Sequence, residues 1–385
     1  MGSSLTQFVL VWWITQKTGS ANSLAIASMM AMLPVAVFSP LGGVIADRLS
    51  RRLVMICADA ITAICMVVLI ILFRTGNVQL WQIYTLMFIR ASMQSFQHPA
   101  VAASTANLVP TNWLERVAGM NQALQGVMTI AAAPLGALAL AFLPTEGALM
   151  IDVVTALLGI SPLFFYHIPQ PKRADQEKPA SVFTDMREGA SYIIHRRGFL
   201  PLYAVTGLVV LTIMPTFALT PLLVTQHFNG GVNDVAIMEG LAGVGIILGG
   251  LIIGVFKLPA KRVYIIMISF AISCGTVALT ALAPANMFWL AVFWWFVSGV
   301  SFSTGNGPMV AVLQKLIPNE IQGRALSLLS MVFGLAGPLG LAIAGPLGEA
   351  YGVRVVFIAG GTLSALINLI ALASRPLREI ENQEE

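Results

Sequence analysis

The chain has 385 residues, of which 57% are hydrophobic and only 10% are charged. A soluble globular protein carries about 25% charged residues, so this composition excludes a soluble domain. The net charge of +4 would suit an anionic partner. The basic residues, however, stand at the ends of long apolar blocks, which is typical of membrane topology and not of nucleic-acid binding.

The apolar blocks are long enough for helices that cross a bilayer, since a span takes about 20 residues at 1.5 Å per residue. The predicted spans lie at about residues 1–15, 23–46, 53–73, 80–105, 117–141, 146–168, 199–225, 234–256, 263–283, 286–309, 322–347 and 353–374. The first block would reach only ~22 Å. We therefore expect a first helix that is truncated, through a misplaced start or a partial sequence.

A polar, basic segment at 169–198 divides the spans into six and six, and an amphipathic helix is predicted in it from Phe183 to Ile194. Placing the basic loop 48–52 in the cytoplasm puts most of the 21 Lys and Arg residues on that side. Positive residues gather on the cytoplasmic side of membrane proteins. We therefore expect a multi-pass protein of the inner (plasma) membrane with both termini in the cytoplasm.

The two sets of spans repeat one another in sequence. Four short motifs recur in the same order, 204 to 210 residues later: 42–45 as 249–252, 51–54 as 261–264, 108–110 as 316–318, and 133–136 as 337–340. Parallel repeats of this kind are typical of transporters that move two halves about a central site. The predicted organisation is an N-terminal six-helix bundle at 1–168, a cytoplasmic linker at 169–198, a C-terminal six-helix bundle at 199–374 and a cytoplasmic tail at 375–385.

Residues 43–52 read Gly-Val-Ile-Ala-Asp-Arg-Leu-Ser-Arg-Arg. This run resembles the signature loop between helices 2 and 3 of the major facilitator superfamily, Gly-x-Leu-Ala-Asp-Arg-x-Gly-Arg-Arg/Lys, with Ser50 where glycine is usual. The resemblance covers essentially the whole chain beyond the first helix. It implies an all-α membrane protein of the major-facilitator fold, with twelve transmembrane helices in two six-helix parallel-repeat bundles, and we expect a monomer.

Shorter runs, including 17–21, 88–90 and 228–230, look closest to the macrolide-efflux branch of drug:proton antiporters. That resemblance implies export of bulky hydrophobic compounds by proton antiport. Two patterns depart from it: Arg90 is not followed by the Gln-Gly of the helix-4 pattern, and 133–137 keeps only part of the helix-5 pattern. Antiport direction and coupling ion therefore stay open. The alternatives are an exporter of siderophores or other native metabolites, and a non-transporting membrane sensor.

The signature loop implies a gating motif. Its residues in this chain are Gly43, Asp47, Arg48, Arg51 and Arg52. A carboxylate at the cytoplasmic end of the second span can pair with basic groups or a facing helix N-terminus, and so hold two halves together in one state. The arginines alternatively serve only as cytoplasmic anchors.

Charges inside spans cost ~2.5–3.5 kcal/mol on insertion scales and are functional candidates by default. Arg90 would lie ~15 Å deep, and Asp59 and Asp152 each ~9 Å from a membrane face. Either acid could pair with Arg90, and an acid beside an arginine stays ionised until the pair opens. We therefore expect Asp59 or Asp152 to carry the coupling proton, or else to form a static ion pair.

Two further titratable residues are candidates for proton coupling. Glu239 lies shortly after Asn233 and Asp234, which resemble a helix N-cap, so it alternatively only answers the helix dipole. His98 precedes Pro99 and could relay protons, or could bond a carbonyl freed by the proline.

A substrate cavity is expected between the halves near the midplane, where methionines adapt to varied apolar ligands. Its candidate lining residues are Gln7, Met29, Met32, Met93, Gln94, Gln122, Gln125, Met214 and Asn306. Each could equally be ordinary packing. The sequence has no phosphate-binding loop, metal-ligand spacing or nucleophile elbow, so we expect no enzyme, cofactor or metal. The expected partners are a small hydrophobic substrate, protons and membrane lipid.

Overall fold

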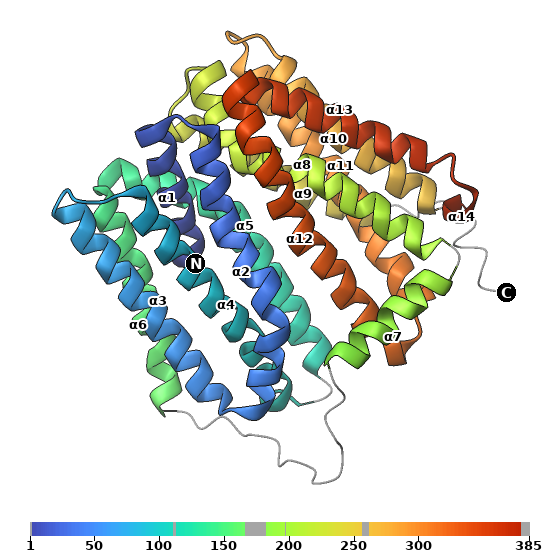
Figure 1. Cartoon of the computed structure of the whole chain (residues 1–385), viewed down its shortest axis with the longest axis horizontal. Helices are drawn as coiled ribbons and strands as arrows, with labels where there is room; N and C mark the ends of the chain where they lie inside the picture. The colour runs from blue at the N-terminus through green and yellow to red at the C-terminus, as the bar shows by residue number, and fades with distance from the viewer. Residues whose placement is uncertain (1, 111–112, 166–181, 197, 256–261, 379–385) are drawn as a thin grey trace. The chain divides into compact units, whose positions relative to one another are not determined.

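The computed structural model describes residues 2–110, 113–165, 182–196, 198–255 and 262–378, and in these ranges all regular structure is helical. The helices can be followed along the chain in Figure 1. The first seven are α1 (Gly2–Thr18), α2 (Ala21–Arg48), α3 (Arg51–Arg74), α4 (Leu80–Leu108), α5 (Leu114–Phe142), α6 (Thr145–Phe165) and α7 (Val182–His195). The others are α8 (Phe199–His227), α9 (Val232–Val255), α10 (Arg262–Leu282), α11 (Phe288–Leu316), α12 (Asn319–Tyr351), α13 (Val353–Ala371) and α14 (Arg375–Arg378).

Every predicted span is found as a helix. Within the described ranges, ten helices are long and apolar enough to cross a membrane. The other two predicted spans are α1, which has 17 described residues, and α4, whose polar residues lower its hydropathy. Large apolar side chains such as Ile64, Val255 and Ile370 are more than 60% exposed, as expected where hydrocarbon is the solvent. The prediction of an all-α membrane protein is confirmed.

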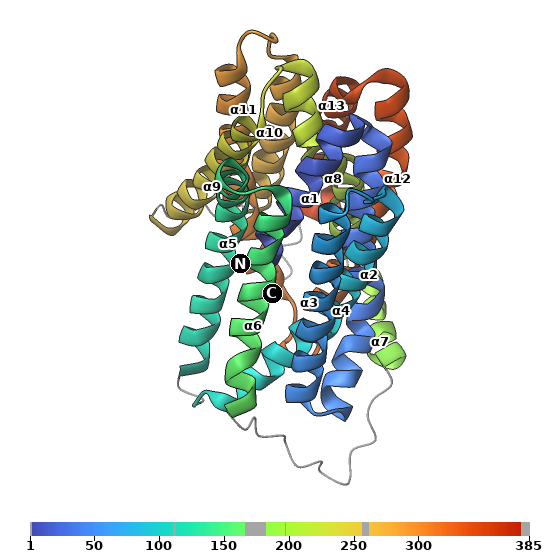
Figure 2. The same cartoon turned by 90° about the vertical axis from the view of Figure 1, so that its left-hand side faces the viewer.

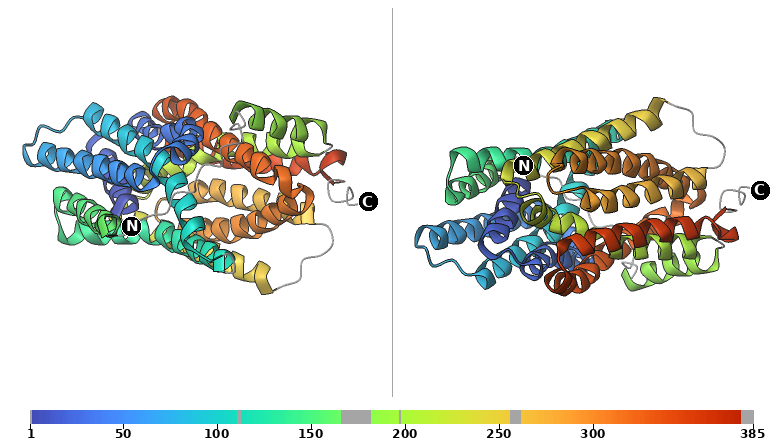
Figure 3. Two further views of the ribbon diagram at one scale, coloured as in Figure 1. Left: turned by 90° about the horizontal axis from the view of Figure 1, so that it is seen from below. Right: turned by 90° about the horizontal axis from the view of Figure 1, so that it is seen from above.

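The contacts of the chain group it into two compact units. One contains Met1–Gly19 and Ile26–Glu177, and the other contains Ser20–Ala25 and Lys178–Glu385. Within the first unit α3 packs against both α4 and α6, as Figure 2 shows, and α1 packs against α5 and α6. Within the second unit α11 packs against α9 and α10, visible in Figure 3, and α13 packs against α8 and α10. The boundaries at 168 and 199 stay predictions.

The same kind of close helix contact is found inside each of the two units. A Cβ on Gly42 of α2 would stand 2.1 Å from the Ser95 carbonyl oxygen of α4. A Cβ on Gly249 of α9 would likewise stand 2.3 Å from the Val300 carbonyl oxygen of α11. Since these contacts join corresponding helices at motif positions that recur in the sequence, they support the internal repeat. Small residues allow this approach where no hydrophobic force draws helices together in lipid.

The amphipathic helix predicted from Phe183 to Ile194 is found as α7. Its Ile193 is buried in a cluster with Phe199 and Ile317. The Tyr192 hydroxyl donates to the Leu316 carbonyl oxygen at 3.2 Å. The linker helix is therefore fixed against the ends of α8 and α11 in its own unit.

The close packing of α9 against α11 predicts unequal effects of two alanine substitutions on one helix. Gly249→Ala should lower the free energy of unfolding by about 1–3 kcal/mol, because its Cβ overlaps the α11 backbone. Gly254→Ala is the matched control, since a Cβ there meets nothing within 4 Å. Unfolding in detergent, followed by circular dichroism, measures both. A Gly249→Ala variant as stable as the control would contradict the packing.

Candidate functional site

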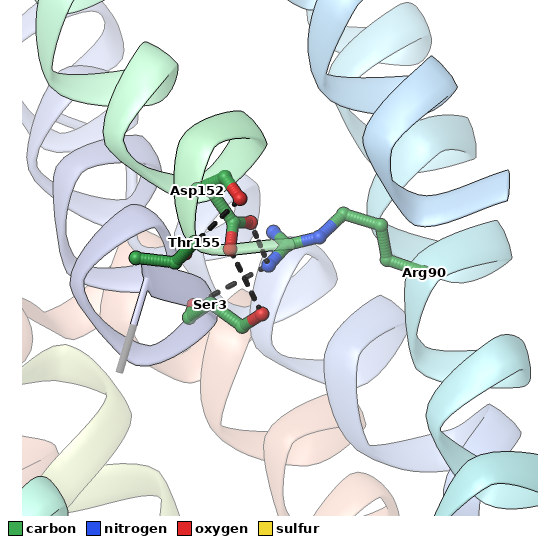
Figure 4. A network of polar contacts seen from close by, with 4 residues as sticks. All are labelled: Ser3, Arg90, Asp152 and Thr155. Atoms are coloured by element: carbon green, nitrogen blue, oxygen red, sulfur yellow. Dashed lines mark hydrogen bonds and ion pairs between the residues drawn. The ribbon is translucent and has the colours of Figure 1, made fainter. Parts of the chain in front are cut away.

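A buried ion pair joins α4 to α6. Arg90 Nη2 lies 3.2 Å from Asp152 Oδ2, and the two side chains are 4% and 3% exposed. Figure 4 shows the guanidinium of Arg90 reaching from α4 toward the Asp152 carboxylate. Of the two acids predicted as partners for Arg90, Asp152 is therefore the one that the structure brings to it.

Helix α1 completes this site. Ser3 Oγ donates to Asp152 Oδ1 at 3.0 Å, and Arg90 Nη2 also donates to the Ser3 carbonyl oxygen at 3.3 Å. The Thr155 hydroxyl donates to the Asp152 carbonyl oxygen at 3.1 Å. A Cβ on Gly2 would stand 2.1 Å from Thr155 Oγ1, so α1 crosses α6 at this glycine. Three helices thus meet at one charged contact, which we call the Arg90–Asp152 site (Figure 4).

Two polar atoms in this part of the first unit are buried without a hydrogen-bond partner among the described residues. They are Arg90 Nε and Thr6 Oγ1. Thr6 lies one helical turn beyond Ser3 on α1. An unsatisfied buried donor costs about 1–3 kcal/mol, so the site holds its charges with less hydrogen bonding than it could use. Such a pair is easier to open than a fully satisfied one.

Asp59 takes a different partner. Its Oδ1 accepts a hydrogen bond from Gln97 Nε2 at 2.5 Å, which joins α3 to α4. Asp59 is half-buried. Ser3, Gln97 and Thr155 were not predicted as site residues, because an uncharged polar residue in an apolar block gives no signal of its partner.

The gating motif is described only in part. Gly43, Asp47 and Arg48 lie in the last turns of α2, and the side chains of Asp47 and Arg48 fall outside the described ones. Arg51 is buried, and its Nη1 donates to the Ala103 carbonyl oxygen of α4 at 2.9 Å. Arg52 is half-buried. Arg51 therefore ties the start of α3 to the last turns of α4, a more specific position than that of a membrane anchor.

The other two titratable candidates stand apart from this network. Glu239 is half-buried in the second turn of α9, and no hydrogen bond or ion pair joins it to another described residue. The helix begins at Val232, before Asn233, and Asp234 Oδ2 accepts from the Gly231 backbone N–H at 2.7 Å. The predicted N-cap at Asn233 and Asp234 is therefore wrong. His98 is exposed, and among the described side chains it bonds no carbonyl freed by Pro99.

The candidate lining residues differ in exposure. Gln125 is exposed, and the side chain of Gln122 falls outside the described ones. The remaining candidates are half-buried: Gln7, Met29, Met32, Met93, Gln94, Met214 and Asn306. They come from both units, so their common cavity stays a prediction. Within the described ranges no group of three His, Cys, Asp or Glu side chains could hold a metal ion.

Comparison with known proteins places the chain in a family. A family model described as a transmembrane secretion effector of the major facilitator superfamily matches residues 1–385. The chain is 30% identical over 379 residues to macrolide efflux protein A of Streptococcus pyogenes, covering 98% of this chain and 94% of the relative. It is 24% identical over 401 residues to the multidrug efflux pump Tap of Mycolicibacterium fortuitum, covering 99% of this chain and 94% of that pump.

Solved structures agree at the level of the fold. The nucleoside transporter NupG superposes with a TM-score of 0.69 at 17% sequence identity, over 97% of this chain and 96% of the transporter. The helical spans, the full-length family match and this likeness lead to one assignment. The chain belongs to the major facilitator superfamily of membrane transporters, among its transmembrane secretion effectors.

Proposed function

We propose that the chain exports hydrophobic, macrolide-type compounds across the cytoplasmic membrane in exchange for protons. The observation that carries this proposal is the Arg90–Asp152 site, a charged contact buried among membrane-spanning helices. The similarity to macrolide efflux protein A and to Tap supports the substrate class. This similarity favours drug-like compounds over a siderophore or another native metabolite.

The coupling mechanism follows from what a proton does to this contact. Protonating Asp152 removes the charge that holds Arg90, and Arg90 must then find another acceptor or water. Because Ser3 bonds both members of the pair, the change acts directly on α1 as well as on α4 and α6. Alternating access would use this as a switch, with the proton bound in one state and released in the other.

Asp59 is the second acid in the proposal. Its hydrogen bond to Gln97 places it on the contact between α3 and α4, seven residues along α4 from Arg90. Being half-buried, Asp59 can exchange protons more readily than Asp152. A proton that enters at Asp59 and moves to Asp152 would pass between two groups attached to the same helix.

The orientation and organisation complete the proposal. The basic loop at 48–52 and the linker at 169–198 would face the cytoplasm, together with both termini. Asp47 and the arginines near it would gate the cytoplasmic side, and the protein would work as a monomer. The methionine-rich positions of the two bundles would line the path of the substrate.

The Arg90–Asp152 site predicts that the effects of Arg90 and Asp152 on stability are strongly coupled. Asp152→Asn should lower the free energy of unfolding by about 3–5 kcal/mol, because it leaves Arg90 charged and buried without its partner. Arg90→Met combined with Asp152→Asn should lose less than Asp152→Asn alone, because no charge is then stranded. Thermal unfolding of the purified variants gives the coupling energy. If the stability losses of Asp152→Asn and Arg90→Met, measured singly, add up to the loss of the double variant, the two residues are not coupled.

Proton exchange is tested by transport in inside-out vesicles. An acid-inside pH gradient should drive accumulation of a macrolide, and a protonophore should abolish it. The double variant Asp59→Asn/Asp152→Asn should accumulate at least about tenfold less, because it lacks both acids proposed to carry the proton. A tenfold loss corresponds to a change of only about 1.4 kcal/mol in activation free energy. The single variants show which acid is required. Asp234→Asn, which changes only a helix-end hydrogen bond, is the matched control.

Exchange of labelled for unlabelled macrolide without a gradient separates coupling from binding. It should survive in the acid variants that fold, because exchange needs no net proton movement. Gradient-driven accumulation that persists in the double variant would contradict the proton-coupling role. A wild-type protein that moves no compound of a macrolide panel would contradict the substrate class.

A further inference from the structure

The first turn of α2 packs within the second unit. The segment Ser20–Ala25 belongs to that unit, although α1 before it and the rest of α2 after it belong to the first. The chain therefore passes from one unit to the other and back at the turn that joins α1 to α2. A contact at this turn can act on both units.

Two glycines of α12 form a notch for this segment. A Cβ on Gly348 would stand 2.8 Å from the Ala21 Cβ, and a Cβ on Gly345 would stand 2.9 Å from the Ala25 Cβ. Ala21 and Ala25 are only 2% and 1% exposed. Small residues on both sides let the two helices approach this closely. A larger side chain at either glycine would push α2 and α12 apart.

A carboxylate of α12 closes the same contact. Glu349 Oε2 accepts a hydrogen bond from the Ser20 hydroxyl at 2.9 Å and another from the Asn22 backbone N–H at 3.4 Å. Ser20 Oγ also accepts from the Ser23 backbone N–H at 3.2 Å, as an N-cap residue does. The Glu349 carboxylate therefore lies at the N-terminus of α2, where backbone N–H groups have no partner in their own helix.

Glu349 has an unfavourable place in its own helix. It lies in the last turn of α12, where the helix dipole disfavours a negative charge, whereas the first turn of a helix favours one. The first turn of α2 contains no acid of its own. Glu349 thus supplies the charge that the start of α2 lacks. This interaction offsets the cost in α12 only while the two helices are in contact.

We propose that Glu349 and the notch at Gly345 and Gly348 form a latch, here called the outer latch, which holds α2 on α12 in one state of the transport cycle and releases it in the other. In the predicted orientation this end of α2 faces outward, and Asp47 of the gating motif lies at the opposite end of the helix. Opening one end while the other closes is what alternating access requires. The inference rests on the alternating access of the proposed function, but neither on protons nor on the substrate class.

The reactivity of a thiol at position 21 tests the outer latch without any substrate. The probe is Ala21→Cys with Cys57→Ser, which removes the exposed native thiol. A membrane-impermeant maleimide, added outside cells that express the full chain, should react slowly with it, because position 21 is buried against Gly348.

Removing the charge of Glu349 should open the outer latch. Adding Glu349→Gln to the probe should raise the reaction rate at least about fivefold, because a neutral amide interacts less with a helix N-terminus. Fivefold corresponds to ~1 kcal/mol at 1.4 kcal/mol per tenfold change. Glu146→Gln, which removes an acid from the first turn of α6, is the matched control and should leave the rate unchanged.

A second variant opens the same contact by steric overlap. Gly348→Ala should also raise the reaction rate at position 21, whereas Gly231→Ala, where a Cβ meets nothing within 4 Å, should not. Native Cys274 is buried in the second unit. A variant in which Cys274 reacts is unfolded, and the other variant then decides. A rate that neither Glu349→Gln nor Gly348→Ala raises would overturn the proposal.

Transport separates a latch that moves from a contact that stays closed. Because the outer latch opens in each cycle, long exposure should label position 21 completely, and the attached maleimide should then stop export by keeping the latch open. A thiol that never reacts, or export that continues after complete labelling, would overturn the proposal. A wild-type protein that moves no macrolide would contradict the proposed function, while the reaction rates would still test the latch.

Discussion

A buried charge in hydrocarbon needs a partner, and the pair of Arg90 and Asp152 meets that need. Removing one partner of such a pair costs several kcal/mol, because the other charge is left behind. The arrangement of α1, α4 and α6 must therefore keep these two groups within reach of each other. Ser3 adds α1 to this constraint through two hydrogen bonds. A change of protonation at this point acts on three helices at once.

The corresponding positions in the second unit carry no charge. Arg90 is the eleventh residue of α4 and Ser298 the eleventh of α11, both helices being 29 residues long. Ser298 accepts a hydrogen bond from Ser273 at 3.0 Å. Asp152, the eighth residue of α6, corresponds to Gly360 in α13, where a Cβ would stand 2.5 Å from the Thr212 carbonyl oxygen of α8. The close crossing of α1 with α6 thus recurs as that of α8 with α13, whereas the ion pair between α4 and α6 distinguishes the first unit.

The sequence predicted the helices well, because hydrocarbon thickness fixes their length and apolar blocks are easily recognised. It also predicted that Arg90 needs an acid, but left Asp59 and Asp152 as alternatives. Depth along a helix can be counted from sequence, whereas the rotation that brings one acid to Arg90 depends on packing. For the same reason Gln97 and Ser3 gave no signal. The N-cap at Asn233 was wrong because the helix begins before it and Asp234 bonds backward to Gly231.

Hydroxyl groups show how sparingly these helices use polar contacts. Many serines and threonines donate to a carbonyl oxygen one turn back on their own helix, as Thr15, Ser92 and Thr220 do. Such bonds hide the hydroxyl from lipid without fixing a neighbouring helix. Hydroxyls that reach another helix, as Ser3 reaches Asp152, are therefore informative. They occur where two helices must hold one relative position. In the first unit that position contains Arg90 and Asp152, the only charged side chains among those described there that are buried in contact with each other.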